Sequence, residues 1–146
     1  MHSIYDDVSV SKSIAPQSDS GGSAVNGGVV DTIGYETAML VFEAGDISGT
    51  PDTTSVSIKL QEGSLANGSD MADAKDNTGT VIGGILTDSG VFLARIEGLG
   101  LNRKRYLRVV ETTTFTNGTT PAVLVHGNIL LGRGLEKPAN TGASNT

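Results

Sequence analysis

The chain has 146 residues, with 16 acidic and 10 basic side chains, a formal net charge of −6 and a sequence pI near 4.7. It contains no cysteine, which excludes disulfides, cysteine-ligated zinc and thiol nucleophiles. Because 20 residues are glycine and only 37% are hydrophobic, we expect a modest core with many turns.

The first 29 residues are expected to form an extended N-terminal arm. Residues 11–28 mix Ser, Gly, Pro and Asn with isolated aliphatic residues, a pattern that does not form a buried face. The closing residues 137–146 are similar and predict a C-terminal tail. No opening apolar run resembles a secretory signal, and no stretch reaches the ~18 apolar residues of a membrane span. We therefore expect synthesis in the cytoplasm and no membrane partner.

Residues 30–136 are expected to form a single β-sandwich domain between these ends. Residues 36–44 are apolar on both faces, as in a fully buried strand, whereas residues 55–61 alternate cleanly. Asn117-Gly118 is typical of a tight hairpin between the last two strands. The pattern, without βαβ alternation or a repeat, predicts an all-β antiparallel sandwich or jelly-roll-like fold. The candidate strands are 36–44, 55–61, 91–97, 105–115 and 122–131.

Few residues point to catalysis or to a bound cofactor. The two histidines lie in the arm (His2) and in a candidate strand (His126), and no metalloprotease, serine-hydrolase or phosphate-loop motif is present. Residues 70–79 space aspartates three positions apart, unlike the alternate positions of a calcium-binding loop. A turn-forming loop is favoured there, and cation binding stays open. We expect no catalytic residue, no cofactor and no metal, and a protein that is not an enzyme.

Charge is distributed unevenly along the chain. The first 92 residues hold thirteen acids and three bases, whereas the rest hold three acids and seven bases, four of them between Arg103 and Arg108. Nucleic-acid binding needs a broad basic face, usually with aromatic side chains for stacking. In a strand Tyr106 and Arg108 would share one face and Arg105 the other, which splits the cluster. We expect these arginines to pair with acids, within the subunit or across a copy of it, and expect no nucleic-acid partner.

Several segments in a fixed order carry a family resemblance. Asp-x-x-Gly-Tyr-Glu (31–36) opens the first core strand and Arg-Tyr-Leu-Arg-Val (105–109) occupies a late one. From about Val30 to Pro138 the chain resembles small β-rich virion proteins of tailed bacteriophages. The matching segments are VDTIGYETAMLVFEAGDIS (30–48), VSIKLQEG (56–63), the Asp-rich loop, GLNRKRYLRVVETTT (100–114) and TNGTTPAVLVHGNILLGRG (116–134).

The resemblance implies a structural component of a phage particle. It implies a capsid decoration or cement protein on the head surface, which contacts the major capsid protein and forms trimers or other homo-oligomers. A head–tail connector or tail subunit is an alternative, as is a host- or carbohydrate-binding module, although the chain has no Trp and three Tyr. The residues expected at subunit or capsid interfaces are Ile4, Tyr5, Val8, Val10 and Ile14 in the arm, the contacts Arg103, Arg105, Tyr106 and Arg108, and their partners Asp31, Tyr35 and Glu36.

Overall fold

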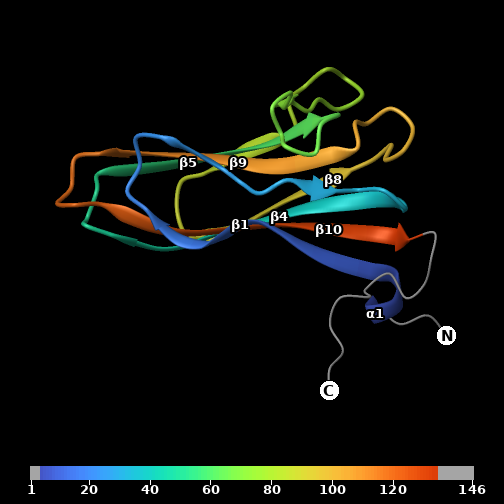
Figure 1. Ribbon diagram of the computed structural model, residues 1–146. Helices are drawn as coiled ribbons and strands as arrows, with labels where there is room; N and C mark the ends of the chain where they lie inside the picture. Colours follow the sequence, from blue (N-terminus) through green and yellow to red (C-terminus); the bar gives the residue numbers. More distant parts are fainter. Residues whose placement is uncertain (1–3, 135–146) are drawn as a thin grey trace.

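The computed structural model describes residues 4–134, which form two antiparallel β-sheets packed face to face (Figure 1). Sheet A has the strand order β1 (Val8–Asp19), β10 (Ala122–Gly134), β4 (Tyr35–Ser48) and β8 (Gly90–Ile96). Sheet B has the order β2 (Ala24–Asn26), β9 (Tyr106–Thr116), β5 (Thr53–Gly63) and β6 (Ala72–Asp73), with β3 (Val30–Asp31) beside β9 and β7 (Gly83–Leu86) beside β5. One helical turn, α1 (Ile4–Asp7), precedes β1.

The all-β antiparallel sandwich predicted from the sequence is confirmed, and the jelly-roll connectivity stays a prediction. All five candidate strands are present, as β4, β5, β8, β9 and β10. The core lies between the sheets and follows the alternation of β5, whose Val56, Ile58 and Leu60 are fully buried. No helix in residues 4–134 has the length and apolar character needed to cross a membrane.

The strand β4 corrects the expectation of a strand buried on both faces. Leu40 and Phe42 point into the core and are fully buried, whereas Met39 is exposed and Val41 is half-buried on the opposite face. Sheet A has no second layer of described residues over that face. An apolar run across both faces therefore leaves hydrophobic side chains on the outside of the sandwich.

The N-terminal segment corrects a second expectation, because residues 8–26 belong to the sandwich and not to a separate arm. β1 pairs with β10 along its length and β2 pairs with β9. Ile14 is only 1% exposed and lies in the core. Isolated aliphatic residues suffice here because backbone pairing with β10 holds the strand and few inward side chains are needed. Residues 1–3, the side chain of Tyr5 and the predicted tail at 137–146 lie outside the described part of the chain.

The Asn117-Gly118 turn is a third correction, because it does not close a hairpin. β9 lies in sheet B and β10 in sheet A, so the turn carries the chain from one sheet to the other. Asn117 and Gly118 both have positive φ, at 57° and 96°, as a tight turn requires. The neighbouring crossing from β4 to β5 packs against it, and the Thr119 amide donates to the Gly49 carbonyl at 2.7 Å. Positive-φ turn residues thus specify a sharp turn without specifying which strands pair.

Candidate interaction surface

The basic segment before β9 is neutralised inside the subunit. Arg105 donates from Nε and Nη2 to Oδ1 and Oδ2 of Asp31, at 2.8 and 2.7 Å. These hydrogen bonds lower the pKa of the Asp31 carboxyl below its usual value. The Arg105 guanidinium also lies 5.1 Å from the centroid of the Tyr106 ring. The predicted pairing of Arg105 with an acid is confirmed, and it is made within one subunit.

Arg103 and Arg108 are also held by neighbouring strands. Arg103 contacts Glu62 at the end of β5, with 3.2 Å between Nη1 and Oε2, and both side chains are largely buried. Arg108 donates from Nε and Nη2 to the amide oxygen of Gln61, at 2.9 and 2.7 Å. The partner of Arg108 is thus a neutral amide. The guanidinium donors of this cluster are directed to the protein's own acceptors, which reduces its capacity to bind an external anion.

Glu36 and Tyr35, the other predicted partners, lie at the start of β4 and away from Arg108. Glu36 pairs with Arg133 of β10, with 3.1 Å between Oε2 and Nε. Tyr35 is half-buried beside it and pairs in the sheet with Gly134. The structure therefore pairs Asp31 with Arg105, as predicted, but pairs Glu36 with Arg133, which was not among the predicted contacts.

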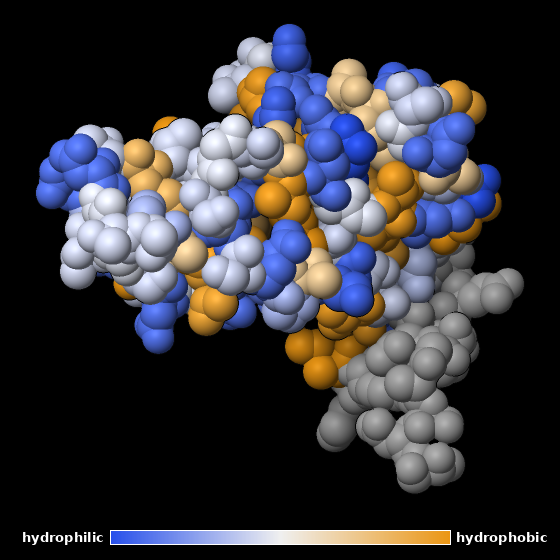
Figure 2. Space-filling model, turned by 60° about the vertical axis from the view of Figure 1, so that its left-hand side comes forward, coloured by the Kyte–Doolittle hydropathy of each residue, from blue (hydrophilic) through white to orange (hydrophobic). Residues whose placement is uncertain are grey.

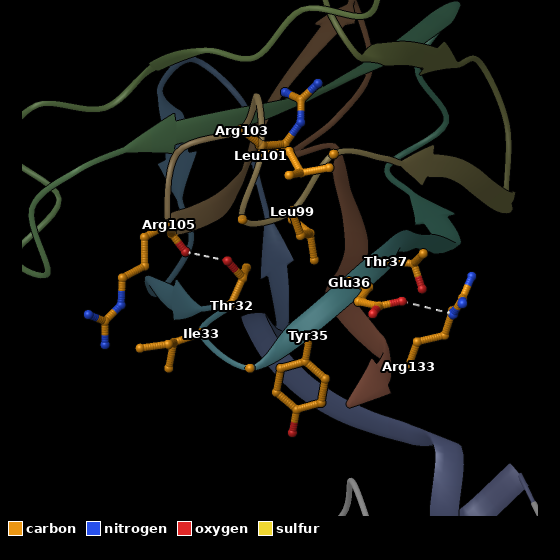
Figure 3. A pocket seen from close by; sticks show the side chains of 13 residues that line it. Thr32, Ile33, Tyr35, Glu36, Thr37, Leu99, Leu101, Arg103, Arg105 and Arg133 are labelled. Carbon is orange, nitrogen blue, oxygen red and sulfur yellow. Dashed lines mark hydrogen bonds and ion pairs between the residues drawn. The ribbon is translucent and has the colours of Figure 1, made fainter. Parts of the chain in front are cut away.

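A groove of about 740 Å³ lies between the start of β4 and the loop before β9 (Figure 3). Arg105 lies on one side of it and the Glu36–Arg133 ion pair on the other. The Thr32 hydroxyl donates to the Arg105 carbonyl at 2.6 Å, which ties the two walls together. Leu101, on the rim, is 85% exposed. The groove therefore combines apolar lining residues such as Ile33 and Leu101 with charged side chains on its rims, a composition that can hold an apolar group.

The outer face of sheet A carries a continuous apolar strip. The register places Leu130 beside Met39, and Val41 beside Leu93 of the edge strand β8. Leu93 is 57% exposed. Hydrophobic side chains also interrupt the hydrophilic surface in the view of Figure 2. This strip, called the sheet A patch below, consists of Val10, Met39, Val41, Val91, Leu93 and Leu130.

The predicted N-terminal anchors are divided between surface and interior. Ile4 and Val10 are exposed and Val8 is half-buried, so these side chains are accessible to a partner. Ile14 is buried between the sheets, which overturns its selection as an interface residue. A register shift between Lys12 and Ile14 accompanies this inward turn of β1.

The Asp-rich loop uses its carboxylates to hold its own turns. Asp70 accepts from the amides of Ser64 and Leu65 at 2.8 and 3.1 Å, and Asp76 accepts from those of Thr78 and Thr80 at 2.8 and 2.9 Å. The hydroxyl of Thr78 also donates to Asp76, at 2.6 Å, and this bond lowers the pKa of Asp76 most, followed by the amide bonds, while the amide bonds lower the pKa of Asp70. Among residues 4–134, no three His, Asp or Glu side chains are grouped to hold a metal ion.

Glu111 is a buried carboxyl group that the sequence analysis did not select. Its side chain is fully buried on β9, between Val109 and Thr113 on the inward face. The sequence does carry an indication of this position, because alternate residues of a strand point to the same face. Glu111 therefore shares its face with Leu107, Val109 and Thr113 in a strand rich in β-branched residues. A charged residue at an inward position of such a strand identifies an interior polar site.

The fold and surface define a small antiparallel β-sandwich with an exposed apolar face and an internally paired basic cluster. Comparison of the chain with models of known protein families, and with curated protein sequences, finds no match.

Proposed function

We propose that the protein is a non-enzymatic structural protein of a phage virion, of the head decoration or cement type. It binds the outer surface of the head, bridges subunits of the major capsid protein and associates with copies of itself. The proposal is supported by the segments at 31–36 and 105–109 that resemble phage virion proteins, and by the accessible surface described above.

The sheet A patch is the observation that carries the proposal. Contiguous exposed apolar side chains on a soluble domain usually mark a surface that contacts another protein. Charged groups border the patch, with Lys12 on β1 and Arg95 on β8 beside Met39, where Arg95 pairs with Glu97 at 2.7 Å. An apolar centre with a charged rim is the usual composition of a protein–protein interface.

A flat, non-catalytic sheet face suits binding to a repetitive lattice. Each copy needs only a modest contact, because several linked copies that bind equivalent lattice sites gain avidity without new contacts. The groove beside Arg105 offers a second contact, in which an apolar side chain of a neighbour fits between the charged rims.

The first test is the number of copies per particle. Quantitative mass spectrometry of purified particles compares this chain with the major capsid protein. About one copy per capsid subunit is expected. A dozen or fewer copies would indicate a connector or tail component, and complete absence from particles would overturn a virion role.

The second test identifies the contact surface. The substitution Leu93→Lys places a charge in the sheet A patch and is expected to lower occupancy on particles more than tenfold, since ~1.4 kcal/mol corresponds to a factor of ten. Ser57→Lys adds the same charge on the exposed face of β5 and serves as the matched control. Arg108→Glu tests the predicted role of the basic cluster. Native occupancy with Leu93→Lys would exclude the patch as the contact.

A further inference from the structure

Two carboxyl groups lie together where β1 of sheet A passes into β2 of sheet B. Asp19 is the last residue of β1, and Glu111 of β9 is 0% exposed. Each has one buried oxygen, Oδ2 of Asp19 and Oε2 of Glu111, that receives no hydrogen bond from the described residues. The other oxygens are satisfied, since Asp19 Oδ1 accepts from the Gly21 amide at 3.0 Å and Glu111 Oε1 accepts from the Thr113 hydroxyl. The turn that follows Asp19 lies on β9 beside Glu111, since the Gly22 amide donates to the Thr113 carbonyl at 3.2 Å, and Asp19 contributes to the raised pKa of Glu111.

No described cation faces this pair. The inward side chains of β2, β4, β5 and β10 are not titratable, and among residues 4–134 Asp19 is the charged group that acts on Glu111. The nearest bases on these strands point outward, where Lys59 pairs with Asp73 and His126 lies beside Glu43. Lys12 of β1 is exposed. Burial, opposed by the Thr113 hydrogen bond and reinforced by Asp19, raises the pKa of Glu111 to about 7.

We propose that Asp19 and Glu111 share one proton, and that this hydrogen bond is a pH-sensitive latch between the end of β1 and sheet B. The proton resides on Glu111, and Oε2–H donates to Oδ2 of Asp19. One proton satisfies both buried oxygens, whereas two ionised carboxylates would place like charges in the interior without a counter-ion. The latch does not depend on the proposed virion role.

Release of the proton to solvent is expected to open the β1–β2 connection. Between the end of β1 and the start of β2, the printed backbone tie to sheet B is the Gly22 amide to the Thr113 carbonyl at 3.2 Å. Beyond it, β2 pairs with β9, and the Gly27 amide donates to the Val109 carbonyl at 2.9 Å. Gly21 and Gly22 have φ of 80° and 91°, which glycine adopts without steric penalty, so the turn can rearrange easily. The segment is therefore closed below neutral pH and loosened above it.

Carboxyl-carbon NMR on the full chain tests the shared proton directly. The Glu111 carboxyl carbon is expected to titrate with a midpoint near pH 7 in the native protein. In Asp19→Asn the amide replaces the carboxylate and can donate to Glu111, so the midpoint is expected to fall, although burial continues to raise the pKa of Glu111. A Glu111 that is already ionised at pH 5 in the native protein would overturn the proposal.

Amide hydrogen exchange tests the latch. After correction for the intrinsic pH dependence of exchange, protection of the Gly22 and Gly27 amides is expected to fall at least tenfold between pH 6 and pH 8. Glu111→Gln, which keeps the shape and cannot ionise, is expected to abolish this change, whereas Glu97→Gln on the surface leaves it intact. Equal pH dependence in native protein and Glu111→Gln would overturn the latch. So would protection restored at pH 8 by calcium in the native protein alone, since a cation would then bridge the pair.

Discussion

Arg105 and Asp31 are joined by two parallel hydrogen bonds, of 2.8 and 2.7 Å, that connect residues 74 positions apart in the chain. The pair fixes the segment before β9 to the end of β3 and holds Arg105, which lines the groove beside β4. Both side chains are about half exposed, at 47% and 40%, so solvent weakens the attraction. In the basic cluster at 103–108, Arg105 therefore mainly makes contacts within its own subunit.

Replacing Arg105 by Lys is expected to lower the denaturation midpoint only slightly, because lysine keeps the charge but loses the two-pronged geometry and the exposed pair is screened by solvent. Chemical denaturation at neutral pH measures the change. The control is Arg95→Lys, whose pair with Glu97 is 81% and 55% exposed and is expected to contribute nothing measurable. A large downward shift of the midpoint for Arg105→Lys would show that the pair is more than a surface contact.

Gly49→Ala is expected to destabilise the fold strongly, because two effects coincide at this turn. Gly49 has φ of 78°, and a Cβ there would lie 2.5 Å from the Thr119 carbonyl oxygen and 2.6 Å from Pro121 Cα. The matched control is Gly79→Ala, where φ is 85° but no atom lies within 4 Å. The control is expected to cost about 1–2 kcal/mol from backbone strain alone. Thermal unfolding should show a clearly larger loss for Gly49→Ala, and equal losses would exclude the clash.

The strands could be predicted from sequence because their alternation records which side chains face the core. Val56, Ile58 and Leu60 are buried as their spacing predicts. The N-terminal strand was missed because its stability comes mainly from backbone pairing with β10, which leaves no pattern in the side chains. The hairpin at Asn117 was predicted wrongly because turn residues determine local φ and not the strand that follows.

The candidate site could be predicted only in part, for a similar reason. Charge counting correctly predicts that Arg105 pairs with an acid of the first half of the chain. It does not reveal that Met39 and Leu93 are exposed, because an apolar strand has the same sequence whether its second face is covered or open. Nor does it show that Glu111 is fully buried near the end of β1, since this placement depends on how the two sheets stack.

Acidification is expected to release the Asp-rich loop before the sandwich unfolds. The pKa values of Asp70 and Asp76 are lower in the folded protein than the ordinary value of 3.8. A carboxyl group whose pKa is lower in the folded than in the unfolded protein stabilises the fold at every pH above the unfolded pKa. This stabilisation is lost as the pH falls through the folded pKa, which for Asp70 and Asp76 lies below about 4. Amide exchange of Ser64 and Thr80 against pH measures it.

Asp70→Asn is expected to reproduce the acid effect at neutral pH for the Ser64 amide, because the neutral side chain is a weaker acceptor. Asp88→Asn, in the turn between β7 and β8, is the control and should leave this loop unchanged. A loop whose exchange is insensitive to Asp70→Asn would contradict its role as a cap of the turn.

Ser13 is expected to be a stabilising residue of the N-terminal strand, despite its small side chain. Its hydroxyl accepts from the buried Val109 amide of β9 at 2.9 Å and donates to the Gly28 carbonyl at 2.9 Å, so it bridges the two sheets. Ser13→Ala leaves the Val109 amide without this partner, at a cost of about 1–3 kcal/mol. Ser18→Ala, on an exposed position of the same strand, is the control and should stay within ~0.5 kcal/mol.

The variants Ser13→Ala and Ser18→Ala test whether β1 is an integral strand of the sandwich or a segment attached to its surface. If β1 is an integral strand, denaturation of Ser13→Ala should remain one cooperative transition with a lower midpoint, because sheet A and sheet B lose a shared contact together. If the segment were only an attached arm, the main transition would keep its native midpoint, and increased exchange would be confined to the amides of β1. A native midpoint in Ser13→Ala would therefore contradict the assignment of β1 to the sandwich core.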